Sequence, residues 1–180
     1  MNEFFTGDLN EKTPADLAAD YACDLGFDKA GDYIRRHFDG DSFSPGDIIP
    51  ITTRNQNLDG QHLDGVSFSR RNVELADGLT LEGVFPEFDA SLFHVDLGDA
   101  ARDMSLHQQF ASCRAEFQDH MYDLPLPDSL TFGDMERMDS CQGYAPRGFT
   151  WNHNPETGSF DLIPTEVHRT YGHTGGNALW

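Results

Sequence analysis

The stretch from residue 148 to residue 180 constrains the fold of this chain more than any other part of the sequence. Residues 149–153 alternate between apolar and polar side chains as a β-strand does, residues 154–158 are rich in turn formers, and residues 159–163 make a second short strand. This pattern predicts a β-hairpin close to the C-terminal end of the sequence.

A helix is expected directly after the hairpin. Pro164 stands where the chain leaves the sheet, Thr165 can accept a hydrogen bond from the first free helical N–H groups, and Glu166 suits the positive end of a helix. Gly172 is expected to end the helix. The predicted order is strand, turn, strand, helix.

This order brings His153, at the end of the first strand, next to His168 on the helix and His173 just beyond it. Together with Asn152 they form a set of nitrogen and oxygen donors that can hold one divalent cation and leave one imidazole free as a base. The spacing of two histidines alone is a weak signal. Chance proximity in a chain with eight histidines is the alternative interpretation.

The same segment resembles nucleases of the HNH/endonuclease VII superfamily of the Trp-His-His class, which are commonly the C-terminal toxin domains of bacterial polymorphic toxins. The resemblance rests on Thr150-Trp151-Asn152-His153, Leu162-Ile163-Pro164, His168, Gly172-His173-Thr174-Gly175-Gly176 and Trp180. It extends more loosely upstream to Arg54-Asn55, Leu58, Gly60, His62, Gly65-Val66, Phe68 and residues 83–89. The resemblance therefore spans residues from about 50 to 180.

The resemblance implies an α+β fold with a ββα-metal core (HNH, His-Me finger) at the C-terminus, preceded by a mixed strand and helix region. We accordingly divide the chain into an acidic helical N-terminal segment, residues 1–47, and an HNH-type nuclease domain, residues 48–180. The metal site is expected within residues 147–176.

The resemblance also implies roles for individual residues. His153 would be the general base that takes a proton from water. Asn152, His168 and His173 would hold one divalent metal ion. Arg169 and Arg147 are candidates for gripping phosphate oxygens, because a guanidinium matches them in two-point fashion, and a solvated surface role is the alternative for each.

Asn152 departs from the family pattern, which has a histidine at this position. An amide oxygen is a weaker ligand than an imidazole or a carboxylate, so we expect loose binding and a preference for Mg²⁺ or Mn²⁺, with Zn²⁺ or Ni²⁺ possible. Loss of activity is the alternative consequence of the replacement.

These features lead to the hypothesis of a divalent-metal-dependent endonuclease, most simply a DNase, that acts as an antibacterial toxin in interbacterial competition. The expected partners are DNA, with RNA as a further possible substrate, and a cognate immunity protein. The rival hypothesis is a degenerate, catalytically weak protein of the HNH fold whose acidic surface binds a protein partner.

The net charge of −19 opposes binding to nucleic acid, because most nucleic-acid-binding proteins carry a basic face. The charge is unevenly distributed: residues 141–180 hold two arginines against three carboxylates, so −18 falls in residues 1–140. The predicted site is thus nearly neutral before a cation binds. Solubility or a saline environment explains the acidic remainder most simply, and mimicry of nucleic acid is the alternative.

The sequence also predicts where the chain is made and what it does not bind. No apolar run approaches the ~20 residues of a membrane span, and residues 1–5 lack the basic start of a signal peptide. We expect synthesis in the cytoplasm, delivery by a secretion system into the cytoplasm of a target cell, and no membrane partner. Cys23, Cys113 and Cys141 are expected to be reduced thiols, with a disulfide as the alternative.

The remaining sequence predicts a mixed set of elements. Helices are expected over residues 14–38 with a break at Gly26, over residues 100–122, and over residues 130–138. Strands are expected over residues 48–53, 66–68, 72–75, 79–84 and 92–95, and residues 85–88 are not expected to continue a central strand, because Pro86 has no N–H. Residues 39–47 and 55–60 are expected to be loops.

The helix predicted over residues 100–122 carries an apolar stripe of Met104, His107, Phe110, Cys113, Phe117 and Met121, with charged and amide side chains opposite. The stripe indicates a core-facing helix that packs against the hairpin. His107 is expected to be a core histidine and His120 to face water. His62 and His94 are expected to be structural.

Overall fold

The computed structural model describes residues 12–124, 130, 131, 133, 134, 136 and 144–180. It combines two β-sheets with helices, so the predicted α+β class is confirmed. The N-terminal segment up to residue 11 and most of the helix predicted over residues 130–138 lie outside the described residues. In the described residues, no helix has the length and apolar character needed to cross a membrane.

Two antiparallel helices open the described chain, as the apolar spacing predicted. They are α1 (Pro14–Asp24) and α2 (Asp28–His37), and Gly26 between them takes a φ of +83°, which glycine adopts without strain. Thr13 caps α1 by accepting a hydrogen bond from the backbone N–H of Asp16. The following connector, residues 39–47, is irregular, as expected.

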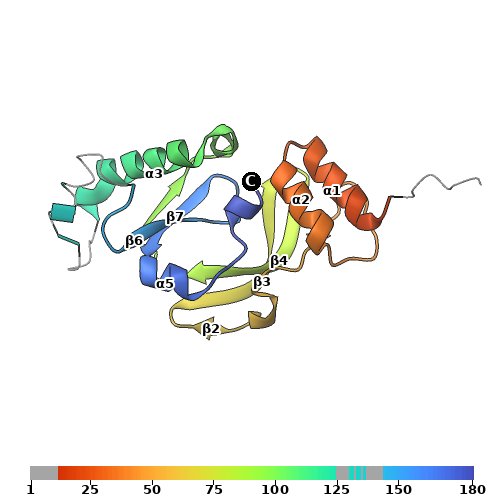
Figure 1. Cartoon of the computed structure of the whole chain (residues 1–180), viewed down its shortest axis with the longest axis horizontal. Coiled ribbons are helices and arrows are strands. Elements are labelled where there is room, and N and C mark those ends of the chain that lie inside the picture. The colour runs from red at the N-terminus through yellow and green to blue at the C-terminus, as the bar shows by residue number, and fades with distance from the viewer. Residues whose placement is uncertain (1–11, 125–129, 132, 135, 137–143) are drawn as a thin grey trace, which may run out of the picture.

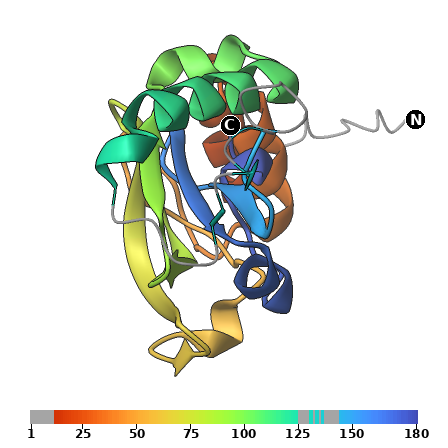
Figure 2. The ribbon, with the colours of Figure 1, turned by 90° about the vertical axis from the view of Figure 1, so that its left-hand side faces the viewer.

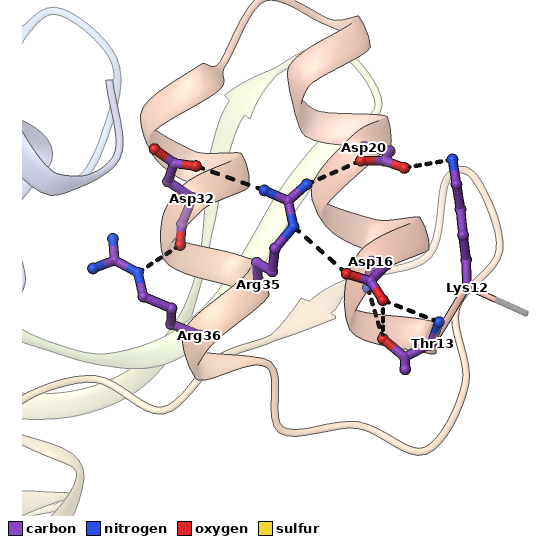
Figure 3. Close-up of polar contacts among 7 residues, drawn as sticks. All are labelled: Lys12, Thr13, Asp16, Asp20, Asp32, Arg35 and Arg36. Atoms are coloured by element: carbon purple, nitrogen blue, oxygen red, sulfur yellow. Dashed lines mark hydrogen bonds and ion pairs between the residues drawn. The ribbon is translucent and has the colours of Figure 1, made fainter. Parts of the chain in front are cut away.

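Arg35 on α2 ties the two helices together through carboxylates on both of them (Figure 3). Its guanidinium lies 3.5 Å from Asp16, 3.0 Å from Asp20 and 3.6 Å from Asp32. Lys12 pairs with the second carboxylate oxygen of Asp20 at 2.6 Å. These pairs are exposed to solvent, which screens their attraction, so the network orients the helices more than it stabilises the fold.

A four-stranded sheet forms the middle of the molecule, in the order β1-β4-β3-β2. Its strands are β1 (Ile49–Pro50), β2 (His62–Leu63), β3 (Val66–Ala76) and β4 (Leu79–Phe88). β1 is a short edge strand parallel to β4, and β3 and β4 form an antiparallel hairpin. A 3-10 turn, η1 (Gln56–Leu58), lies in the loop before β2.

The prediction of separate strands over residues 66–68 and 72–75 was wrong, because β3 runs through the polar residues between them. Ser69, Arg70 and Arg71 stay in register with residues 85, 84 and 83 of β4. Arg70 is exposed and Ser69 and Arg71 are only partly buried, so polar residues are tolerated at these positions. Pairing with a regular neighbour strand outweighs the local sequence signal here.

The prediction that residues 85–88 cannot continue a central strand was also wrong. Pro86 lies opposite Phe68 in β3, but the N–H and C=O of Phe68 bond to Gln61 and Gly60 on its other side. Pro86 therefore occupies a non-hydrogen-bonded pair, where no N–H is needed toward β3. On its other side, β1 reaches β4 only at residues 81 and 82, so Pro86 lies along a locally free edge.

A three-stranded antiparallel sheet carries the C-terminal segment, in the order β5-β7-β6. It consists of β5 (Phe93–Asp96), β6 (Phe149–His153) and β7 (Ser159–Pro164), and α5 (Thr165–Thr170) follows directly. The predicted hairpin and helix are confirmed. The predicted cap is not: the N-cap of α5 is Pro164, and Thr165 is the first helical residue, whose own N–H donates to the carbonyl of Gly148.

The helix predicted over residues 100–122 is present, but a turn divides it. A 3-10 turn, η2 (Asp99–Asp103), precedes α3 (Leu106–His120), and η3 (Met121–Asp123) follows. Ser105 caps α3 and exchanges hydrogen bonds with Gln108. Figures 1 and 2 show α3 at one end of the molecule, far from β2 at the other.

The apolar face of α3 is confirmed as core-facing, with two corrections. Cys113, Phe117 and Met121 are buried. His107 is exposed and lies against Tyr144, so the prediction of a core histidine was wrong. Its place among the buried residues is taken by Gln109, although the amides were expected to face away from the core.

One apolar core joins the helices to both sheets. Its members include Ala22, Ile34, Phe85, Phe117, Phe160 and Trp180. A second, smaller cluster packs beneath α5 and is made of Val66, Phe68, Val84, Phe88 and Ile163. The hairpin that carries the predicted site is therefore held between two apolar clusters. The predicted boundary between an N-terminal segment and a nuclease domain at residue 47 stays a prediction.

Candidate active site

The predicted general base and the three predicted metal ligands line one cavity of about 470 Å³. Asn152 and His153 reach it from β6, His168 from α5 and His173 from the loop after α5. Arg54, from the loop after β1, lies in the same wall. The hairpin and the short helix thus bring together residues that are up to 21 positions apart in the C-terminal segment.

Two of the three predicted imidazoles gather with the amide of Asn152. Oδ1 of Asn152 lies 2.9 Å from Nε2 of His173, and Asn152 is buried. The rings of His168 and His173 stand at right angles with their centroids 5.3 Å apart. Two imidazoles that bind one ion at ~2.0–2.1 Å have their centroids at a similar separation, so this pair fits a shared cation.

A chain of hydrogen bonds fixes the orientation of the Asn152 amide. Asn154 donates from Nδ2 to the carboxylate of Asp161 at 2.7 Å, and a carboxylate can only accept. The oxygen of the Asn154 amide must then face Asn152, whose Nδ2 donates to it at 2.7 Å. Oδ1 of Asn152 is consequently directed at His173.

The position of the proton on the His173 ring determines whether a donor or a lone pair faces Oδ1 of Asn152. Nδ1 of His173 donates to the backbone carbonyl of Tyr171 at 3.2 Å, so in a neutral ring Nε2 carries a lone pair. That lone pair faces Oδ1 of Asn152, which is also an acceptor. Two converging lone pairs repel each other unless a proton or a metal cation offsets them, so the donor set is compatible with a metal ion.

The protonation of the two histidines also fits metal binding. Burial lowers the pKa of His168, and the neighbouring His173 and Arg169 act in the same direction. Burial likewise lowers the pKa of His173. Neutral imidazole is the form that binds metals. In the described residues, no three His, Cys, Asp or Glu side chains are arranged to hold a metal ion, so a three-donor site here would need the amide oxygen of Asn152.

His153 lines the same cavity but faces a different set of neighbours. Successive residues of a strand point to opposite faces, so Asn152 and His153 diverge. Nε2 of His153 donates to Oε1 of Gln109 at 3.0 Å, and its ring packs on Phe160 and Trp180 with centroid distances of 4.7 and 5.4 Å. The compact cluster of three imidazoles expected from the sequence is therefore a pair of histidines with a third beside it.

Burial lowers the pKa of His153 to about 4, and the positive charges of Lys29 and of protonated His168 add to the effect. The ring is neutral at pH 7 and able to accept a proton. This state suits a general base, which must be unprotonated when water enters the site.

Arg54 is a site residue that sequence reasoning did not assign. Its guanidinium lies over the backbone of Gly172, where an added Cβ would come within 2.8 Å of Cζ. Its backbone N–H donates to Oγ1 of Thr174 at 3.1 Å. Arg147 and Arg169 are exposed and do not line the cavity, so their contact with phosphate stays a prediction. The available signal was the Arg54-Asn55 pair in the upstream resemblance.

The Gly-Gly pair after His173 lets the last loop pass close to β6. A Cβ on Gly175 would lie 2.8 Å from the carbonyl oxygen of His153, and one on Gly176 would overlap the carbonyl oxygen of Asn154. Trp180 then donates from Nε1 to the same Asn154 carbonyl at 3.2 Å. The loop is thereby held against the strand that supplies the site.

The N-terminal helices also support this loop. Thr174 Oγ1 lies 2.9 Å from the hydroxyl of Tyr33 on α2, and Tyr33 donates to the carbonyl of Thr52 at 3.1 Å. Lys29 of α2 donates to the backbone oxygen of Trp180 at 2.7 Å. His62 and His94 lie outside the cavity, where they pair with Asp89 and Asp161.

The comparisons with known proteins find a match in the C-terminal segment. Residues 142–180 match the WHH family model, described as a nuclease of the HNH/ENDO VII superfamily with conserved WHH. No curated protein and no solved structure matched the chain. The matched residues include the hairpin, α5 and the loop with His173, while Arg54 and Gln109 lie outside them. The C-terminal segment of this chain, residues 142–180, is therefore similar to the WHH family of HNH/ENDO VII superfamily nucleases.

Proposed function

We propose that this protein is a divalent-metal-dependent endonuclease that hydrolyses phosphodiester bonds, with DNA as its substrate. The observation that carries the proposal is the approach of Asn152 Oδ1 to His173 Nε2, 2.9 Å apart, with the His168 ring beside them and a neutral His153 in the same cavity. These groups supply metal donors and a base within one site.

Asn152, His168 and His173 would hold one divalent ion. Such an ion, when bound, stabilises the negative charge that develops on a phosphate and on the departing oxygen. An amide oxygen beside two imidazoles favours Mg²⁺ or Mn²⁺ over the softer ions, with Zn²⁺ and Ni²⁺ as alternatives. These donors fit a weakly bound ion that exchanges readily with metal ions in solution.

His153 would act as the general base. Its neutral ring accepts a proton from a water molecule, and the hydroxide attacks phosphorus as the leaving oxygen departs. The aromatic rings of Phe110 and Trp180, with centroids 5.2 and 5.4 Å from the imidazole, limit its rotation. A fixed ring keeps the accepting nitrogen in one direction.

Arg54 would bind the phosphate. Its guanidinium lies in the cavity wall over Gly172, and a guanidinium presents two parallel donors to phosphate oxygens. Arg147 and Arg169, which are exposed near the hairpin and on α5, would contact phosphates that lie further along the substrate. The uneven distribution of charge fits phosphate binding near the C-terminal segment, since the acidic residues are concentrated before residue 141.

We further propose that the nuclease is an antibacterial toxin, blocked by a cognate immunity protein and delivered by a secretion system into the cytoplasm of the target cell. The support is the resemblance of the C-terminal segment to the toxin nucleases of this class. RNA remains a second substrate, because the same donor set can cleave either nucleic acid.

Asn152 supports a second candidate function. It replaces the first histidine of the family pattern, and the net charge of −19 is unfavourable for nucleic-acid binding. A chain with a weakened site would act through its acidic surface by binding a basic protein partner.

Cleavage assays separate these candidates. Purified protein is incubated with plasmid DNA and with structured RNA, each with Mg²⁺, Mn²⁺ or EDTA. The endonuclease proposal predicts metal-dependent nicking that EDTA and His153→Ala abolish, with His120→Ala as the matched control because His120 is an exposed histidine outside the cavity. Intact DNA and RNA with every metal would favour the binding protein.

A further inference from the structure

Gln109 is a buried amide on α3 that connects the site to a part of the chain outside the matched family segment. The residue is 4% exposed. Nε2 donates to the backbone carbonyl of Ala101 in η2 at 2.7 Å, and Oε1 lies 3.0 Å from Nε2 of His153. Both ends of the amide are therefore occupied.

The chemistry of these two contacts fixes every proton in them. The carbonyl of Ala101 can only accept, so the NH₂ group of Gln109 must face it. The oxygen of Gln109 then faces His153 and has only lone pairs to offer. Nε2 of His153 must carry a proton to complete the contact, and in a neutral ring the lone pair is then on Nδ1.

The amide is presented by a rigid part of the fold. Ala101 is fully buried, and the first turn of α3 is closed by the Ser105 cap, whose carbonyl accepts from the backbone N–H of Gln109 at 3.0 Å. Cys113, one turn further along α3, is fully buried and anchors the helix. Gln109 therefore has little freedom to follow a change at His153.

We propose that Gln109 is a positioning residue that holds His153 as the Nε2–H tautomer, so that Nδ1 is the nitrogen that receives the proton from water. In the described residues, Nδ1 of His153 has no hydrogen-bond partner. The transfer of a proton from water to Nδ1 rests on the proposed nuclease function. The assignment of the tautomer does not.

Nitrogen NMR of histidine-labelled protein tests the tautomer directly. Metal-free protein is measured at neutral pH, and His153→Ala assigns the resonances of the ring. The proposal predicts a single Nε2–H species with a slowly exchanging proton in the wild type. A ring that carries its proton on Nδ1, or an equal mixture of tautomers, would overturn it.

Three variants separate the hydrogen bond from simple packing. Gln109→Met keeps the length of the side chain but loses both polar contacts, so it should allow both tautomers and rapid proton exchange. Gln109→Glu keeps an acceptor toward His153 and should retain the Nε2–H form. Phe110→Leu reduces the ring packing on His153 but leaves Gln109 in place, so its tautomer should match the wild type. An unchanged tautomer in Gln109→Met would contradict the proposal.

Kinetics then link the tautomer to the reaction. Gln109→Met should lower kcat about tenfold and leave KM within about twofold, because substrate binding does not use Nδ1. A tenfold rise in KM with an unchanged kcat would contradict a positioning role. The NMR measurement needs no activity, so a chain that cleaves neither DNA nor RNA would disprove the nuclease function without deciding the role of Gln109. If Gln109→Met fails to fold, the wild-type and Gln109→Glu spectra still decide the tautomer.

Discussion

The amide oxygen of Asn152 and Nε2 of His173 face each other at 2.9 Å, and the hydrogen bonds on their far sides leave both atoms with lone pairs. The short distance between these two atoms shows how asparagine can take the place of the family histidine: its amide oxygen faces His173. The proposed metal site keeps three candidate donors, one of which is an amide oxygen held in place by its neighbours.

Asn154 holds that amide, so its removal should weaken metal binding although it lies outside the donor set. Asn154→Ala removes the acceptor of Asn152 Nδ2 and frees the amide to rotate. We expect the Kd for Mn²⁺, measured by titration calorimetry, to rise by ~10-fold or more, as for other groups that orient metal ligands. Asn177→Ala, an exposed asparagine at the same cavity, is the control and should leave the Kd unchanged. Equal affinities for the two variants would contradict the role of Asn154.

Substitutions of Arg54 and Gly172 should weaken substrate binding through the same contact, so their effects should not add. Arg54→Ala removes the guanidinium from the cavity wall, and Gly172→Ala displaces it, because the new Cβ would lie 2.8 Å from Cζ. We expect each variant to raise KM for DNA by ~10-fold, which corresponds to ~1.4 kcal/mol, and the double variant to add little to either change.

The matched control is Gly46→Ala, at a distant glycine with no atom within 4 Å of the added Cβ. Its positive φ costs some stability, but KM should stay at the wild-type value. Additive effects of the Arg54 and Gly172 variants would show that the two positions act independently.

His153 should make the stability of the metal-free protein depend on pH. Its pKa is lowered to about 4 in the folded protein from 6.5, so below pH 6.5 the unfolded chain binds a proton that the folded chain does not. The free energy of unfolding should be highest above pH 6.5 and fall as the pH approaches 4, by at most ~1.4 kcal/mol per pH unit from this group. Burial lowers the pKa values of His168 and His173 as well, so they act in the same direction.

Urea unfolding of the wild type and of His153→Gln, in EDTA at several values between pH 7.5 and 5, measures this contribution. The variant should lose less stability on acidification than the wild type. Parallel pH profiles for the two proteins would show that His153 is not held neutral by the fold.

Cys113 should be unreactive in the native protein. It is fully buried, and burial raises the pKa of its thiol to about 12, so at pH 8 only ~10⁻⁴ of it is thiolate. Mass spectrometry after iodoacetamide treatment should find Cys113 modified only in denaturant. Cys23, which is free and only half-buried, should react first and provides the internal control. Rapid native labelling of Cys113 would contradict its burial against the sheet.

The sequence was sufficient where the signals are local. The hairpin and α5 follow from alternation, a turn-rich segment and Pro164, all within about twenty consecutive residues. The same local rules predicted α1, α2 and the break at Gly26. They were misleading at Pro86, because the pairing of Phe68 with the β2 side of the sheet is invisible in the sequence around the proline.

The missed site residues depend on contacts between distant segments. Gln109 reaches His153 across 44 positions, and nothing in its own helix distinguishes it from the exposed amide of Gln108. Arg54 meets Gly172 through the packing of the last loop on the loop after β1, a contact supported by Thr174. Periodicity predicts which face of an element is buried, but it does not identify the distant residue that the face contacts.

The most direct test of the metal site is the anomalous diffraction of a crystal soaked in Mn²⁺. We predict one ion bound to Oδ1 of Asn152 and to the rings of His168 and His173, with His153 unligated and its Nε2 still bonded to Gln109. An ion held by His153, or anomalous density absent from the cavity at saturating Mn²⁺, would contradict this prediction.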